Sequence, residues 1–320
     1  MKKRKLQATG GSSLTLTLPK SWVDRWALRS KDEVFVNETK GGLTIQPASR
    51  TKRDLIYRFD LDGKSSSWIE REMIGSYIAG ADRIELASKR ITSEQNQIIR
   101  QTIRLFFGFE IVRETSDTIV ARTLLNEMSF SIPENTIGVF QMVRSMFEDA
   151  LVAAQDGDKE LATDIIQRDH EVNKIVYAIK RHFQQVLGGK IDNDVAKADF
   201  YRSIAGQIER IGDHAVKIAE LAGNDRTEPV QLSHSFSSIK KGAEQLLQDT
   251  ETMLLHFDID KAHAILDKDH ELEQLIFSSK RMKQSYEGAI VEDSLDRLRG
   301  YVMNIAERMI DYLVSVRQND

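Results

Sequence analysis

The chain has 320 residues, of which 41% are hydrophobic and 29% charged, a composition typical of a globular protein with room for two or three domains. It contains no cysteine, which excludes disulfides and thiolate metal sites, so any metal must be held by oxygen or nitrogen. No run approaches the roughly 20 apolar residues that span a membrane, and the first residues form no apolar signal core. We expect a cytoplasmic protein.

The net charge of −4 hides an asymmetry along the chain. Residues 1–50 hold ten basic and four acidic side chains, an excess of +6, so the remaining residues carry −10. A basic head on an acidic body predicts an anionic partner for the head, and nucleic acid is the first candidate. A short solvated basic segment is the alternative on charge alone.

The head is predicted to consist mostly of short strands. Leucines and threonines alternate over residues 14–18, a half-buried strand that stops at Pro19. A short helix follows over residues 22–26, and residues 34–36 and 43–45 then form a hairpin around Lys40-Gly41-Gly42. About fifty residues build a poor core alone, so we expect the head to dimerise.

The middle of the chain alternates strands and helices. Ser67 and Glu70 have the spacing of a capping box for its first helix, and Gly108 ends its second helix as a C′ glycine. The expected strands and helices are, in chain order, strand 55–59, a helix from about residue 67, strand 83–86, helix 93–107 and a hairpin of 109–113 with 118–122. No phosphate loop or catalytic constellation stands out, and we assign this small α/β domain no role.

The remaining residues show apolar spacings of three and four throughout, which predicts helices. Prolines at positions 47, 133 and 229 mark the expected seams. The predicted fold class is multidomain α+β, with a β-rich head, a small α/β middle and an all-α tail. The predicted domains are residues 1–50, 51–132, 133–228 and 229–320.

The helical tail is an internal duplication. The run from Asp169 to Val172 returns one hundred residues later as Asp269 to Leu272, and the following apolar positions also match. Three helices fit in each unit of about ninety residues, so the tail is predicted to form two three-helix bundles.

Each unit of the tail carries two acidic pairs at helical spacing. Glu-Arg-x-x-Asp occurs at residues 209–213 and again at residues 307–311, and side chains four apart share one helix face. Clustered carboxylates repel each other unless a cation lies between them, so the pattern predicts one metal site per unit. The alternative is a solvated face on which Arg210 or Arg308 pairs with the acids. The predicted ligands are Asp169, Asn173, Glu209, Asp213, Asp269, Glu273, Glu307 and Asp311.

Oxygen ligands favour Mg, Ca, Mn or iron, and His170 or His214 would be accessory ligands for zinc or nickel. Neither unit has the Glu-x-x-His of di-iron bundles, so redox chemistry is not expected. Gly212 stands inside a helix, where we expect close approach of a second helix or a metal cluster. Ile310 takes that place in the second copy, which sets the two sites apart.

The tail resembles the PhoU family of phosphate-uptake regulators. The resemblance lies in the duplicated bundle, in Glu209-Arg-Ile-Gly-Asp213 with the following His214-Ala215-Val216, and in Asp169 with Asn173. It implies a two-bundle fold that binds multinuclear iron, zinc or nickel and acts on phosphate transport and its signalling. Ile310 and Glu273 depart from the family pattern in the second unit.

The head is similar to SpoVT–AbrB domains. Thr9-Gly-Gly-Ser-Ser13, Thr15-Leu-Thr-Leu-Pro-Lys-Ser-Trp22 and Lys31-Asp-Glu-Val34 carry this resemblance. It implies a swapped-hairpin dimer whose basic surface binds DNA, in keeping with the +6 charge. The order of parts resembles archaeal PhoU-type proteins. The expected DNA contacts are Arg4, Lys5, Lys20, Arg25 and Arg29.

These observations favour a homodimeric, non-enzymatic regulator of phosphate homeostasis that binds DNA through its head and metal through its tail. An adaptor that docks on a phosphate transporter ATPase or a sensor kinase without binding DNA is the main alternative. A metallohydrolase with bridging water between paired ions is the least favoured reading.

Overall fold

The computed structural model describes residues 3–10, 13–39, 42–47, 54–124, 130–188, 191, 194–223, 230, 236–279 and 285–317. The chain forms two compact units, residues 1–53 and 54–320.

The head contains two antiparallel strand pairs and one short helix. β1 (Gln7–Thr9) pairs with β2 (Ser13–Thr15), and β3 (Val34–Thr39) pairs with β4 (Gly42–Pro47). The second pair confirms the predicted hairpin, although Lys40 and Gly41 of its turn lie outside the described residues. α1 (Lys20–Arg25) begins directly after Pro19, as the sequence predicts.

The apolar side chains of the head are largely exposed in the single chain. Leu14 is 65% exposed and Leu16 44%, so the prediction of a half-buried strand over residues 14–18 is wrong for the isolated protomer, and β2 ends at Thr15. A two-stranded sheet buries little surface without a second layer. The large apolar side chains exposed in the head are Leu6, Leu14, Leu16, Trp26, Phe35, Val36 and Leu43.

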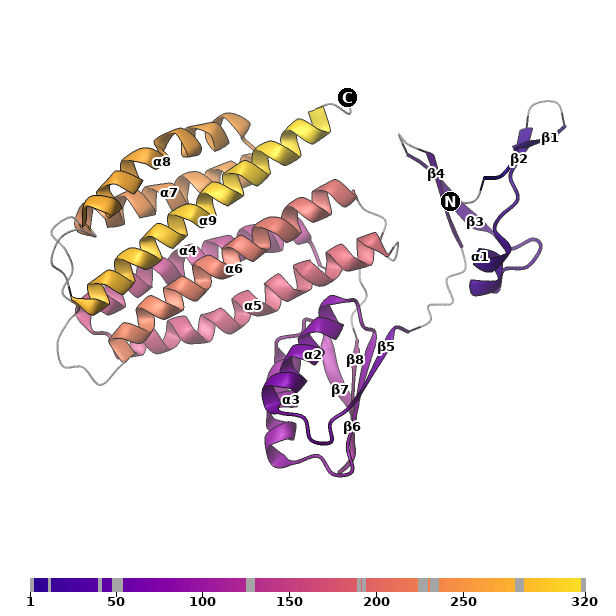
Figure 1. The fold of residues 1–320 in the computed structure, drawn as a ribbon, viewed down its shortest axis with the longest axis horizontal. Coiled ribbons are helices and arrows are strands. Elements are labelled where there is room, and N and C mark those ends of the chain that lie inside the picture. The colour runs from indigo at the N-terminus through magenta and orange to yellow at the C-terminus, as the bar shows by residue number, and fades with distance from the viewer. Residues whose placement is uncertain are drawn as a thin grey trace. The chain divides into compact units, whose positions relative to one another are not determined.

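The middle segment is a four-stranded sheet with two helices along one face (Figure 1). Its order is β5-β6-β8-β7, in which β5 and β6 are parallel and the other neighbours antiparallel. Inward residues of the strands and the apolar faces of α2 and α3 share one core. The elements are β5 (Ile56–Asp60), α2 (Ser66–Ile78), β6 (Arg83–Ala87), α3 (Ser93–Arg104), β7 (Phe109–Glu114) and β8 (Thr118–Thr123).

Helix ends in the middle segment differ from the prediction in detail. The N-cap of α2 is Ser65, whose hydroxyl accepts a hydrogen bond from the Trp68 amide at 3.3 Å, so the capping box assigned to residues 67 and 70 is wrong. The capping box lies instead at α3, between Thr92 and Gln95. α3 ends at residue 104, ahead of the predicted residue 107, because the chain must turn before β7.

In the described part of the tail, six long helices form the two predicted bundles (Figure 1). Their apolar faces form one continuous core that extends through both repeats. The predicted boundary at Pro229 lies outside the described residues, so the domain limits within the tail stay predictions. None of the described helices is long and apolar enough to cross a membrane. The helices are α4 (Ile132–Asp156), α5 (Lys159–Leu187), α6 (Val195–Gly223), α7 (Phe236–His256), α8 (Ile259–Ser279) and α9 (Tyr286–Arg317).

The middle segment packs against α5 of the first bundle. The Arg181 side chain is 9% exposed, and its Nη1 donates a hydrogen bond to the Tyr77 carbonyl at 2.9 Å. The guanidinium lies over the rings of Tyr77 and Phe109, at 4.9 and 5.5 Å from their centroids, and 3.9 Å from the Asp82 carboxylate. Tyr177, one turn earlier on α5, packs against the core of the middle segment. The sheet and the first bundle are therefore parts of one compact unit.

Candidate functional site

The first repeat brings its predicted acidic residues together between α5 and α6. The Asn173 side-chain amide donates to Asp169 Oδ2 at 2.8 Å, and Lys180 Nζ donates to Glu209 Oε2 at 2.5 Å. Asp169 Oδ1 is buried and has no hydrogen-bond partner. A buried carboxylate oxygen that lacks a hydrogen-bond partner and lies beside further carboxylates is a suitable ligand atom for a cation.

The electrostatics of this first cluster, made of Asp169, Asn173, Glu209 and Asp213, point the same way. Burial, and then the negative charge of Asp213, raises the pKa of Asp169 above its ordinary range. Burial and the neighbouring Glu209 likewise raise the pKa of Asp213, against the opposing effects of Arg210 and Lys180. The fold thus holds an excess of negative charge that its own cations do not fully neutralise.

Gly212 allows α6 to pass close to α5 beside this cluster. A Cβ built at this position would lie 3.7 Å from Asp169 Oδ1 and 3.5 Å from Val143 Cγ2. The prediction that a second helix approaches Gly212 is confirmed. Because both distances are ordinary van der Waals contacts, the position has room for a methyl group and little more.

The cluster opens into a pocket of about 350 Å³ between α6 and α9, lined by Glu209, Arg210, Asp213, His214 and Tyr301. His214 Nδ1 lies 3.1 Å from the Ser294 hydroxyl, and burial lowers the pKa of this imidazole. The Arg210 guanidinium lies over the Tyr301 ring at 5.9 Å. The second repeat therefore supplies one wall of the pocket. His170, the other predicted accessory ligand, is exposed.

The second repeat arranges its acids differently. Arg299 Nη1 contacts both carboxylate oxygens of Asp269 at 2.6 Å, and its Nη2 lies 3.5 Å from Glu273 Oε1. Glu307 and Asp311 are both exposed, and Asp311 pairs with Arg308 at 3.3 Å. The predicted convergence of Asp269 and Glu273 with residues 307 and 311 is thus wrong.

The error lies in the register assigned to α9. The buried positions of α9 follow those of α6 at a constant separation of 87 residues, which makes Asp296 the counterpart of Glu209 and Gly300 that of Asp213. Glu307 lies 11 residues after Asp296, about three turns of the same helix, so it falls on a similar face at a different height. The buried pairs are Ile204 and Val291, Ile208 and Leu295, Ile211 and Leu298, Ala215 and Val302, Ile218 and Ile305, and Ala219 and Ala306.

No three histidine or acidic side chains among the described residues stand close enough together to hold a metal ion as they are placed. The first cluster nevertheless has oxygen donors suited to a hard or borderline cation, including the unpartnered Asp169 Oδ1. Glu209 now bonds Lys180 and would exchange that cation for the ion. The second cluster does not fit a metal, because Arg299 occupies it.

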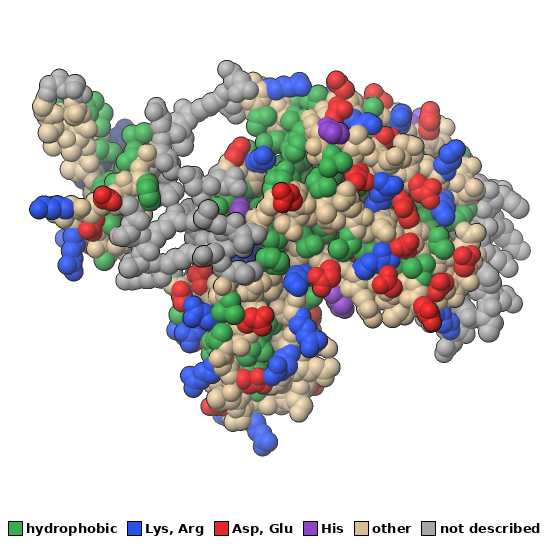
Figure 2. Space-filling model, turned by 180° about the vertical axis from the view of Figure 1, so that it is seen from behind, with side chains coloured by type: hydrophobic (Ala, Val, Ile, Leu, Met, Phe, Trp, Pro, Cys, Tyr) green, Lys and Arg blue, Asp and Glu red, His purple; other side chains and the backbone are tan. Residues whose placement is uncertain are grey.

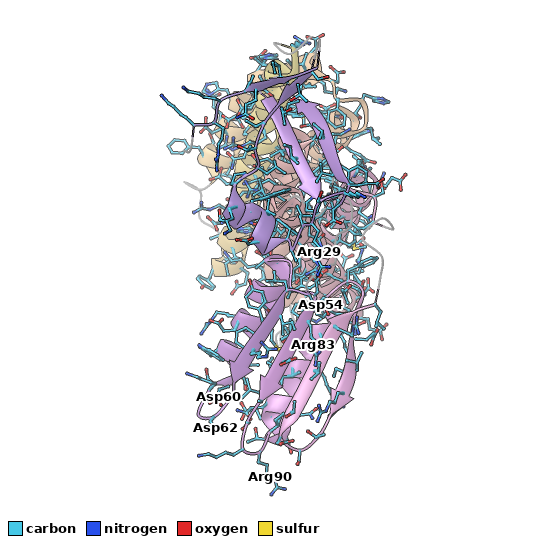
Figure 3. The ribbon with its side chains drawn as sticks, turned by 90° about the vertical axis from the view of Figure 1, so that its right-hand side faces the viewer. Arg29, Asp54, Asp60, Asp62, Arg83 and Arg90 are labelled. Atoms are coloured by element: carbon cyan, nitrogen blue, oxygen red, sulfur yellow. The ribbon has the colours of Figure 1, made fainter. Side chains whose placement is uncertain are left out.

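The predicted DNA contacts lie on the head. Arg4, Lys5, Lys20 and Arg29 are exposed, whereas the side chain of Arg25 lies outside the described ones. The backbone amide of Arg29, labelled in Figure 3, donates to Asp32 Oδ2 at 2.7 Å and fixes the turn after α1. Exposed cations on a small β-rich unit are what phosphate contacts require.

Basic and acidic side chains are interspersed over the visible face of the helical part (Figure 2). In the middle segment, Asp60, Asp62 and Arg90 gather at one end of the sheet (Figure 3), where Ser88 Oγ donates to Asp62 Oδ1 at 2.7 Å. Asp62 thus connects the loop after β5 with the loop after β6.

Two basic residues that shape the acidic clusters escaped the sequence reasoning. Lys180 lies close to Glu209 only after α5 and α6 pack, since 29 residues separate them. Arg299 could have been found by aligning the apolar positions of the two repeats, because this alignment makes Arg299 the equivalent of Gly212. The recurrence of Glu-Arg-x-x-Asp led instead to residues 307–311, which lie about three turns beyond the true equivalents of residues 209–213 on α9.

Two parts of the chain match known protein families. Residues 137–222 match the PhoU domain family, and residues 7–53 match the family described as antidote-toxin recognition MazE, bacterial antitoxin. The PhoU match contains every member of the first acidic cluster.

Individual relatives agree with these matches. The chain is 25% identical over 198 residues to the phosphate-specific transport system accessory protein PhoU homolog of Streptococcus pneumoniae, covering 56% of this chain and 90% of that protein. It is 28% identical over 152 residues to the corresponding Escherichia coli PhoU, covering 47% of this chain and 59% of that protein.

Solved structures share the fold of the tail. The crystal structure of the phosphate transport system regulatory protein PhoU from S. pneumoniae matches with a TM-score of 0.51 at 23% identity, over 57% of this chain and 94% of the other. PhoU from Pseudomonas aeruginosa matches with the same TM-score at 18% identity, over 57% and 96%. The chain therefore carries a PhoU domain in its helical tail and a MazE/AbrB-like domain at its head.

Proposed function

We propose that this protein is a cytoplasmic, non-enzymatic regulator of phosphate uptake, which binds DNA through its head and metal through the first acidic cluster. The observation that carries the proposal is the coincidence of the PhoU match, residues 137–222, with the clustered Asp169, Asn173, Glu209 and Asp213. The named relatives are accessory or regulatory proteins of phosphate transport, which supports the same role here.

The proposed DNA binding rests on the head. Its charge excess of +6 falls on a MazE/AbrB-like domain, and four of the five predicted contact residues are exposed. The head also exposes large apolar side chains such as Phe35, 60% exposed, and Leu43, 66% exposed. We infer that a second copy covers this surface, because a unit of this size rarely leaves so much apolar area in water. The regulator is thus proposed to be a homodimer.

The proposed metal is iron, zinc or nickel, bound as a multinuclear centre, with Mg or Mn as further candidates. Asp169, Asn173, Glu209 and Asp213 would hold it, and the ion would neutralise the charge that raises the pKa of Asp169 and Asp213. Elemental analysis of the purified protein beside Glu209→Ala and Asp213→Ala variants tests this part. Unchanged metal content in both variants would disprove it.

The role in phosphate uptake is tested in the host cell. Deletion of the gene should change the rate of radiolabelled phosphate uptake, or the transcript level of the phosphate transporter, when phosphate is plentiful. A return of both to the parental level on complementation completes the test. Uptake and transcripts that do not respond to the deletion would refute the regulatory role.

DNA binding is tested by its salt dependence. Each lost phosphate contact should lower the slope of log affinity against log salt by about one. We expect this for Arg4→Gln, Lys5→Gln and Lys20→Gln in the head. Lys89→Gln is the matched control, since Lys89 is a 93% exposed cation of the middle segment. Equal effects of head and control variants would contradict DNA binding through the head.

An adaptor without DNA binding is the second candidate, favoured by the words accessory protein in the names of the relatives. It would dock on a transporter ATPase or a sensor kinase. Failure of the whole protein to be retained on DNA at low salt, together with a positive result in the uptake assay, would select this reading over the first.

A further inference from the structure

The second acidic cluster contains a cation of its own. Asp269, Glu273 and Asp296 surround the guanidinium of Arg299, with Nη1 at 2.6 Å from both oxygens of Asp269, Nη2 at 3.5 Å from Glu273 and Nε at 3.2 Å from Asp296. The Arg299 side chain is only 15% exposed. A planar guanidinium matches carboxylate pairs in this way more closely than a point charge does.

The members of this second cluster stand where the first cluster has its donors. Asp269 corresponds to Asp169 and Glu273 to Asn173 by the hundred-residue offset of α5 and α8. By the 87-residue offset of α6 and α9, Asp296 corresponds to Glu209. The two remaining positions differ: the second repeat has Arg299 for Gly212 and Gly300 for Asp213.

The two substitutions are complementary. At the first cluster a Cβ on Gly212 would point at Asp169 Oδ1 from 3.7 Å, so a long side chain at that helix position is directed into the cluster. Arg299 occupies the equivalent position of α9, and its side chain extends to the carboxylate of Asp269. Gly300 at the same time removes one carboxylate from the second cluster. Glu273 in place of Asn173 adds one back, so each cluster has three carboxylates, and the second differs by the arginine fixed among them.

The charge balance of the two clusters differs accordingly. In the first cluster, burial and mutual repulsion raise the pKa of Asp169 and Asp213. In the second, burial alone would lower the pKa of Arg299, but its hydrogen bonds to Asp269 and Asp296 outweigh burial and raise it. All three carboxylates of the second cluster thus contact one guanidinium, whereas Asp169 Oδ1 of the first cluster is buried without a hydrogen-bond partner.

We propose that Arg299 takes the place of a metal ion in the second repeat, so that the chain binds metal at only one of its two acidic clusters. This inference rests on the proposed metal binding of the first cluster. Removal of Arg299 and introduction of a carboxylate at position 300 should therefore turn the second cluster into a metal site.

The experiment measures Fe²⁺ uptake by the whole chain under anaerobic dialysis, read by elemental analysis. The starting variant is Asp169→Asn with Asp213→Asn, which removes the first cluster and should bind no Fe²⁺. Adding Arg299→Gly and Gly300→Asp should restore Fe²⁺ binding at the second cluster. A Cβ at position 300 would meet no other atom within 4 Å, so the aspartate fits.

The matched control adds Arg297→Gly and Gly300→Asp to the same starting variant. Arg297 is an exposed arginine of α9, so this change has the same composition and the same cost in helix propensity but leaves Arg299 in the cluster. The control should take up no Fe²⁺. Equal uptake by the control and the Arg299 variant would overturn the proposal, as would a folded Arg299 variant that takes up none.

A second measurement covers the case in which Arg299→Gly does not fold. Arg299→Met, made together with Gly300→Asp, keeps most of the side-chain volume at position 299, and in the starting variant it should lower the melting temperature. Added Fe²⁺ should raise that temperature again, whereas the starting variant without this change should not respond. No response to Fe²⁺ with Arg299→Met would overturn the proposal. Absence of Fe²⁺ from the wild-type chain would instead contradict the first metal site, whatever the α9 variants show.

Discussion

Arg181 is expected to hold the middle segment to the first bundle, and its replacement by methionine gives a quantitative test. The hydrogen bond from its guanidinium to the Tyr77 carbonyl is charge-assisted, a class that contributes about 1.5–3 kcal/mol. The contacts with the rings of Tyr77 and Phe109 add about 0.5–1 kcal/mol each. Loss of the arginine also leaves the buried Asp82 without this cation. These contributions are not additive, and removal of one partner from such a site costs about 3–5 kcal/mol.

We therefore expect Arg181→Met to lower the free energy of unfolding by about 3–4 kcal/mol, near the lower end of that range because methionine keeps the apolar stem. Urea denaturation measures it with two probes. All three tryptophans lie at positions 22, 26 and 68, so fluorescence in a Trp22→Phe, Trp26→Phe background reports on the middle segment through Trp68. Far-UV circular dichroism reports on the helices.

Arg202→Met is the matched control. Arg202 makes the same kinds of contact, a 2.7 Å ion pair with Asp199 and a position 4.9 Å over the Phe183 ring, but its side chain is 41% exposed. Solvent screening limits its expected cost to less than about 1 kcal/mol. A loss at Arg181 no larger than the loss at Arg202 would refute the docking argument, and so would a fluorescence transition that precedes the helical one in the otherwise unaltered protein.

Three further predictions concern single positions. Burial raises the pKa of Tyr77 to about 12, above its ordinary value of 10.0. The neutral phenol therefore stabilises the fold fully below pH 10, and this contribution falls by about 1.4 kcal/mol per pH unit from pH 10 to 12. Tyr77→Phe should reduce the decrease in the free energy of unfolding over that pH range, and an unchanged pH dependence would contradict this prediction. Asp158 caps α5 through the amides of residues 160 and 161, so Asp158→Ala should cost about 1 kcal/mol in urea denaturation, with a loss below the error of the measurement as the contrary result. Gly212→Ala should stabilise the metal-free chain by up to about 1 kcal/mol, because a methyl group fits at this position and alanine favours the helix. Gly212→Leu should destabilise it. A lower melting temperature for Gly212→Ala would show that α5 and α6 are closer than the structure has them.

Most of the fold follows from local patterns in the sequence. Apolar periodicity predicted three helices in each repeat and the strands of the middle segment, because an amphipathic element must bury one face. Helix caps were predicted less well. Both Ser65 and Ser67 precede or open α2, and only packing decides which hydroxyl meets the Trp68 amide. The exposure of Leu14 and Leu16 could not be foreseen either, since alternation marks the apolar face of a strand but does not say what covers that face.

The first acidic cluster was predictable because both of its acidic pairs follow the four-residue spacing of a helix. Asp169 with Asn173 and Glu209 with Asp213 required only that α5 and α6 face each other. The second cluster was not predicted, because Glu-Arg-x-x-Asp recurs on α9 three turns beyond the true counterpart of Glu209. Buried residues decide which turn is equivalent, since they must fit the same core, whereas surface letters recur by chance.

One helix connects the first cluster with the middle segment. α5 presents Asp169, Asn173 and Lys180 to α6, and it presents Tyr177 and Arg181 to the core of the sheet domain. Burial and the carboxylate of Glu209 raise the pKa of Tyr177 to about 12. Tyr177 therefore packs against the core of the middle segment and also lies within the electrostatic influence of the first cluster.

If the proposed cation drew α5 toward α6 at the first cluster, the movement would reach Tyr177 and Arg181, which lie two to three turns along the same helix. Neither residue can follow such a movement without the sheet, because the Arg181 guanidinium is enclosed between Tyr77, Phe109 and Asp82. The second cluster has no such connection in its described contacts, and Arg299 already fixes its charge. On the proposed metal binding, the first repeat is therefore the one through which a bound ion would act on the middle segment.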